Sequence, residues 1–113
     1  MSLSRIQHQL LELAVEDYYG FWEIIWRVRN LLPNSTASQL SEIAATALRD
    51  LLSRGWVALY RQVLDTGERT PIEPSEVEAV LADPRSWAEP TSDLTPIVFG
   101  ATEEGERAYY GNR

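Results

Sequence analysis

Few side chains in this chain of 113 residues could carry out catalysis or bind a metal. The sequence holds a single histidine, His8, and no cysteine, which excludes thiolate chemistry and disulfide bonds. His8 has no second histidine at the spacing of a metal site, and a Ser–His–acid triad would have to use it. We expect His8, between Gln7 and Gln9, to lie on the solvated side of a helix. The sequence therefore predicts no catalytic residue, no metal site and no cofactor.

Phosphate-binding loops and paired carboxylates are the other sites to consider. The six glycines are isolated along the chain, so no glycine-rich phosphate loop is present. Carboxylates are plentiful between residues 65 and 106, but nothing predicts a cleft that would hold a pair of them. A run of acidic residues is typical of a solvated surface. We therefore predict that the protein is not an enzyme and acts by binding a macromolecule.

The charges are distributed unevenly. Residues 1–64 hold six acidic residues and six arginines, whereas residues 65–113 hold eleven acidic residues and four arginines, which accounts for the whole net charge of −7. Nucleic acids bind mainly through neutralisation of their phosphates, so an acidic half counts against a DNA partner. The charge distribution therefore favours a protein partner or a homodimer and leaves DNA as the disfavoured alternative. No apolar run is long enough to cross a membrane, so no membrane partner is predicted.

Two tryptophans lie four residues apart on a predicted helix over residues 21–32. Trp22 and Trp26 flank its core face, and Arg29 continues the same row. One interpretation is that both indoles widen the core, as large aromatic residues often do. The other is a contact surface for another chain, because tryptophan and arginine are enriched at interface centres. We predict a protein interface at Trp22, Trp26 and Arg29.

The elements that must position these residues follow from apolar spacing, caps and breakers. Helices are predicted over 3–16, 21–32, 36–54, 75–82 and 103–110, with antiparallel strands over 56–63 and 97–101. Residues 17–20 are predicted to break the first helix, and residues 84–96, with three prolines, to form a loop anchored by Trp87. The spacings of Thr36 with Gln39 and of Ser75 with Glu78 predict capping boxes.

The stretch from Leu40 to Arg61 suggests a family. Leu48 and Leu51 precede Gly55 by seven and four residues, Trp56 and Val57 follow it, and residues 99–105 read FGATEEG. This pattern resembles the winged helix-turn-helix domain of small bacterial regulators. The resemblance implies a mostly helical α+β fold in one domain, with a helical core and first wing strand over 3–62, an acidic, helical insertion over 63–96, and a second wing strand and C-terminal helix over 97–111.

The resemblance also implies that helix 36–54 is the recognition helix of a transcriptional regulator. Separately, the lack of cysteine and of a signal-peptide pattern makes a cytoplasmic location the default expectation. Its outward face would then contact DNA, together with the first strand, through Gln39, Thr46, Arg49, Ser53 and Arg61. Glu42 and Asp50 on that face would bring carboxylates close to phosphates. The other interpretation is an ordinary solvated helix face, which commonly carries alternating charges.

Overall fold

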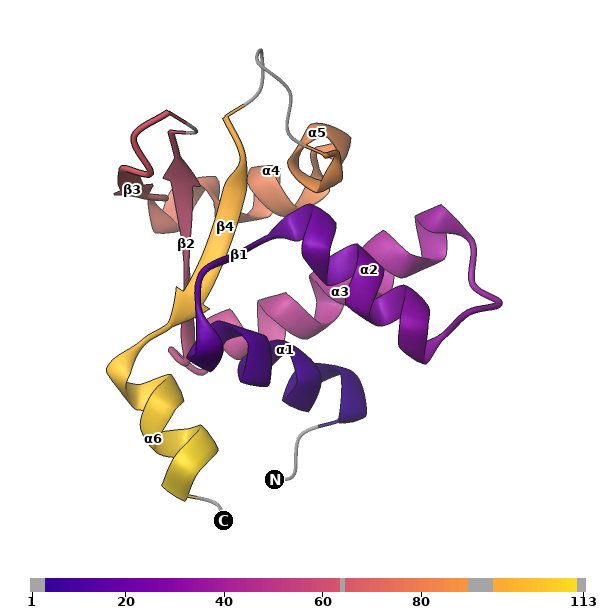
Figure 1. Ribbon diagram of the computed structural model, residues 1–113, viewed down its shortest axis with the longest axis horizontal. Helices are drawn as coiled ribbons and strands as arrows, with labels where there is room; N and C mark the ends of the chain where they lie inside the picture. Colours follow the sequence, from indigo (N-terminus) through magenta and orange to yellow (C-terminus); the bar gives the residue numbers. More distant parts are fainter. Residues whose placement is uncertain (1–3, 64, 90–94, 112–113) are drawn as a thin grey trace.

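The computed structural model describes residues 4–63, 65–89 and 95–111 (Figure 1). They form a mostly helical α+β fold with one four-stranded antiparallel sheet. The elements in chain order are α1 (Arg5–Glu16), β1 (Tyr19–Gly20), α2 (Phe21–Leu31), α3 (Ala37–Ser53), β2 (Val57–Gln62), β3 (Arg69–Pro71), η1 (Pro74–Glu76), α4 (Val77–Ala82), α5 (Pro84–Trp87), β4 (Ile97–Ala101) and α6 (Glu103–Gly111).

The helices begin and end where the local chemistry satisfies their backbone. Thr36 and Gln39 form the predicted capping box at the start of α3, and Ser4 forms another with Gln7 at the start of α1. At the end of α3, Gly55 has a φ of 74°, which is a left-handed conformation that glycine adopts without strain. Its N–H donates to Leu52 O, and the next N–H in the chain donates to Leu51 O, so the last carbonyls of the helix are satisfied.

The sheet is larger than the sequence predicted. The strand order is β1-β4-β2-β3, and the predicted pairing of β2 with β4 is present with Leu59 opposite Phe99. The predicted helix break at residues 17–20 is present, because α1 ends at Glu16, but Tyr19 and Gly20 also form a strand that was not predicted and pair with Phe99 and Val98 of β4. The strand β3, which pairs with β2, was not predicted either. Strands of two and three residues are too short to show an apolar alternation, so only their distant partners reveal them.

The core lies where α1, α2 and α3 pack together and against one face of the sheet, and Figure 1 shows these three helices on the same side of β2 and β4. Phe21, Ile24, Leu48 and Phe99 are fully buried in it. The helix α6 packs against α1 and the end of β4. Thr102, just before the helix, caps it: the hydroxyl accepts from Gly105 N and donates to Gly55 O.

The segment between β2 and β4 folds back onto the helices. Besides the predicted helix near 75–82, which appears as η1 followed by α4, it contains β3 and α5, so residues 84–87 form a helical turn rather than a loop. Trp87 is its anchor, as predicted: the indole lies 4.5 Å from the ring of Phe21 on α2, and its Nε1–H donates to Leu81 O. Residues 90–94 of the predicted loop lie outside the described residues.

Candidate macromolecule-binding surfaces

The outward stripe of α3 carries four of the five predicted DNA contacts, and all four are exposed: Gln39, Thr46, Arg49 and Ser53. Most of their polar groups are bound within the helix itself. The Thr46 hydroxyl donates to Glu42 O and the Ser53 hydroxyl donates to Asp50 O. The Gln39 carbonyl oxygen accepts from Thr36 N as part of the capping box. The hydroxyls of Thr46 and Ser53 and the side-chain oxygen of Gln39 are therefore already hydrogen-bonded within α3 and its cap.

The two arginines in the predicted DNA-contact set are both bound by glutamates of the folded-back segment. Arg49 Nε donates to Glu78 at 2.9 Å, and Arg61 Nη2 on β2 donates to Glu76 at 3.0 Å. The hydrogen bond from Arg49 lowers the pKa of Glu78 below its ordinary value, and the same bond raises the pKa of Arg49. The four side chains are between 44% and 68% exposed, so each pair is energetically modest. Together they neutralise the cations of this face.

Asp50 does not project toward an approaching DNA as the sequence suggested. Its carboxylate accepts from Arg54 Nε at 2.7 Å and from Gln7 Nε2 at 2.8 Å, which ties α3 to the start of α1. The guanidinium of Arg54 also lies 5.0 Å from the centre of the Trp56 ring. The carboxylate and the cation are therefore both used in packing α3 against its neighbours.

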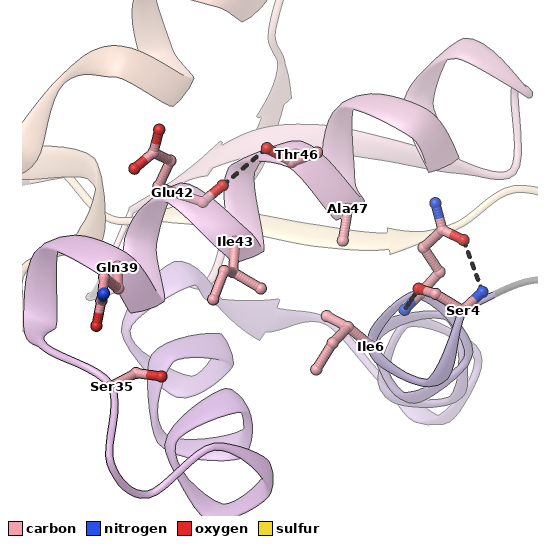
Figure 2. A pocket seen from close by; sticks show the side chains of 9 residues that line it. Ser4, Ile6, Ser35, Gln39, Glu42, Ile43, Thr46 and Ala47 are labelled. Carbon is pink, nitrogen blue, oxygen red and sulfur yellow. Dashed lines mark hydrogen bonds between the residues drawn. The ribbon is translucent and has the colours of Figure 1, made fainter.

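Three hollows lie beside α3. The first, of about 420 Å³, lies between the start of α1 and the first half of α3. Figure 2 shows Ile6 and Ile43 pointing toward each other across it, and Ser35, Glu42 and Thr46 also line it. The second, of about 660 Å³, lies between α2, α3 and the segment with α4 and α5, and the third, of about 470 Å³, lies beside β2 and α4.

The three residues of the predicted interface row on α2 differ in how exposed they are. The ring of Trp22 is half-buried and lies over Gly20, where a Cβ would overlap it. Trp26, one turn further along, is 49% exposed, and Arg29 is exposed beyond it. The folded-back segment covers the Phe21 side of α2 through Trp87 and leaves Trp26 uncovered. Arg27 donates to Gln9 Oε1 on α1, so it holds the two helices together.

The other side chains considered for catalysis or metal binding do not come together in the described residues. His8 is exposed, and its ring stacks on Tyr109 with ring centres 5.7 Å apart. Within residues 4–63, 65–89 and 95–111, no group of three histidine or acidic side chains could hold a metal ion. In the same described ranges no helix is long and apolar enough to span a bilayer.

The two glutamates that bind Arg49 and Arg61 were not predicted from the sequence. The predicted capping box of Ser75 and Glu78 is absent, because Ser75 lies in η1 and α4 begins without a side-chain cap. The assignment failed because an exposed carboxylate on a short helix can instead reach a cation on another element. Comparison of the chain with models of protein families, with curated proteins and with solved structures finds no match.

Proposed function

We propose that the protein is a winged-helix-like module that binds another protein. The order of its elements supports the winged-helix part, because β1 lies between α1 and α2, α3 leads directly into β2, and the strands take the order β1-β4-β2. The resemblance noted from the sequence contained only β2 and β4 of this sheet. The acidic segment between β2 and β4 is then an insertion in the wing, which folds back onto α2 and α3.

The protein-binding part of the proposal rests on a difference between two faces of the molecule: the arginines of one face are in ion pairs, and the arginine of the other is not. On the face of α3 and β2, Arg49 and Arg61 are each bound by a glutamate of the insertion. On the outer face of α2, Trp26 is half-exposed beside Arg29, which forms no ion pair within the described part of the chain. A large exposed indole next to an available guanidinium is the combination that is enriched at the centres of protein interfaces.

Photo-cross-linking in the cell tests this proposal directly. A photoreactive phenylalanine analogue replaces Trp26, and a matched control carries it at Val63, which is 45% exposed and lies just after the end of β2. We expect a covalent protein adduct from position 26 and none from position 63. If position 26 yields no protein adduct, or if both positions yield the same adducts, the proposal is overturned.

A DNA-binding regulator is the second candidate, and one observation favours it. The exposed stripe of α3 is uninterrupted by large apolar residues, so the helix has the polar outer face that a recognition helix needs. The glutamates of the insertion count against it, because they occupy the two arginines that would neutralise phosphates. Tight DNA binding with a steep salt dependence would favour this candidate over the first.

A further inference from the structure

The second hollow, between α2, α3 and the insertion, is the largest of the three hollows beside α3, at about 660 Å³. The helix α2 packs on both α3 and α5, so the elements around the hollow are held to one another (Figure 1). On the α3 side the wall consists of small residues, which leave the space open: Ala37, Ser38, Ser41 and Ala45. A hollow of this volume is of the size that holds small organic molecules.

The walls that α2 and the insertion contribute are mainly apolar. Ile25 of α2 and Trp87 of α5 are half-buried there, and Leu81 of α4 is buried. The indole Nε1–H of Trp87 already donates to Leu81 O, and an indole has no other donor. These walls therefore offer a ligand apolar surface, and an apolar body bound against them would displace water.

Three charged side chains line the hollow, and none of them comes from the insertion: Arg29 of α2, and Glu42 and Arg49 of α3. Arg29 is exposed and forms no ion pair with any described residue. Arg49 uses only its Nε to bind Glu78, and no described residue binds its two Nη groups. Glu42 is exposed and has no ion-pair partner among the described residues either.

These charges indicate the kind of ligand. Two arginines and one glutamate give the lining a formal charge of +1, which a single negative charge matches. A dianion such as a phosphate monoester would meet stronger repulsion from Glu42. A carboxylate carries one charge, and a guanidinium group binds it through two parallel hydrogen bonds.

The other two hollows lack this combination. The only charged residue in the lining of the first is Glu42, and in the third Arg49 and Glu78 bind each other. Of the three hollows among the described residues, only the second therefore places an unpaired cation beside apolar walls.

We propose that the second hollow binds a small organic monocarboxylate with an aromatic or branched apolar body. Arg29 binds the carboxylate, Arg49 adds positive charge to the same hollow, and Ile25, Leu81 and Trp87 contact the apolar body. This site goes beyond the proposed protein-binding function, because Trp26 is not part of its lining.

Three probes that share one body and differ in charge test the site: 3-phenylpropanoate, 3-phenylpropanamide and 3-phenylpropylamine. Each is titrated into the isotopically labelled full chain and followed by NMR, with the indole N–H of Trp87 and the backbone amides of Ile25 and Ala45 as reporters. We expect the carboxylate to bind with a Kd of about 0.1–5 mM, as suits a ligand of this size. It should bind at least about fivefold more tightly than the amide, and the amine should bind most weakly.

Substitutions in the lining test the role of each charge. Arg29→Gln should weaken binding of the carboxylate at least about fivefold and leave binding of the amide unchanged. Glu42→Gln should strengthen binding of the carboxylate about two- to fivefold, because it removes a repelling charge. Ala45→Leu should remove binding of all three probes, because it fills the hollow. The thermal melting of each variant shows that it is folded.

Two control variants change residues outside the lining. Arg107→Gln removes the same charge from an exposed position on α6, and Trp26→Ala removes the exposed indole of the proposed protein interface. Neither should change probe binding by more than about twofold. Since Trp26→Ala leaves the hollow intact, the result of this titration and the cross-linking result at position 26 decide two different proposals.

The inference is overturned if the carboxylate shows no saturable binding up to about 10 mM. It is also overturned if the three probes bind equally, if Arg29→Gln has no more effect than Arg107→Gln, or if Glu42→Gln weakens binding of the carboxylate. Selective carboxylate binding that Arg29→Gln weakens and Glu42→Gln strengthens would support it.

Discussion

Replacement of Trp87 should release the insertion from the helices. In the structure, Trp87 contacts Phe21 at 4.5 Å between ring centres and donates its Nε1–H to Leu81 O. Loss of a fully buried tryptophan costs about 3–5 kcal/mol of unfolding free energy. Trp87 is only partly buried, so we expect Trp87→Ala to cost about 2–4 kcal/mol, of which the aromatic pair accounts for about 0.5–1.5 kcal/mol. Urea unfolding followed by circular dichroism measures the change.

The variant Trp87→Phe is the matched control. It keeps a ring against Phe21 and removes only the hydrogen bond to Leu81 O, so it should cost about 0.5–1.5 kcal/mol. The reasoning would be refuted if Trp87→Ala cost less than about 1 kcal/mol, or no more than Trp87→Phe. Either result would mean that the indole does not hold the insertion on α2.

Three further predictions concern the core, α6 and pH. Leu48 is fully buried, so Leu48→Ala should lower the unfolding free energy by about 2–5 kcal/mol in urea titration, and a loss well below that range would place it outside the core. A Cβ at Gly105 would overlap the backbone carbonyl of Trp56, so Gly105→Ala should cost about 1–3 kcal/mol, whereas Gly111→Ala, which has open space around it, serves as the neutral comparison. The pKa of Glu78 is lowered in the folded protein, so its contribution to stability is present above its ordinary pKa and is lost as the pH falls. Wild type should therefore melt above Glu78→Gln at about pH 7 and together with it at about pH 3, and a difference that persists in acid would contradict the ion pair.

The helices could be predicted from the sequence because their signals are local. The capping box of Thr36 and Gln39 and the glycine at position 55 mark both ends of α3 within the chain itself. Trp87 could be recognised as an anchor because it is a single large apolar residue among prolines. In contrast, Tyr19 and Gly20 become a strand only by pairing with β4, about 80 residues later in the chain, and no local pattern contains that information.

The candidate site was predicted in part for the same reason. A four-residue spacing is enough to place Trp22 and Trp26 in one row, but the sequence could not show that Trp22 lies over Gly20 while Trp26 stays exposed. The pairing of Arg49 with Glu78 joins residues 29 positions apart, and it depends on how the insertion folds back. Because of this long separation in the sequence, Arg49 was predicted to be available for DNA contact, whereas in the structure Glu78 binds it.

Binding to random duplex DNA tests the central proposal, which is that the partner is a protein and not a nucleic acid. The reason is that the glutamates of the insertion bind the arginines on the face of α3 and β2. Fluorescence anisotropy is measured against salt concentration for the wild type and for the Glu76→Gln, Glu78→Gln double variant. We expect wild type to bind more weakly than about 100 μM at 50 mM salt. The double variant should bind more tightly, with a log–log salt slope steeper by at most about 1.8, because two arginines are released. Wild-type binding at micromolar concentration or below, with a slope that indicates several phosphate contacts, would contradict the claim.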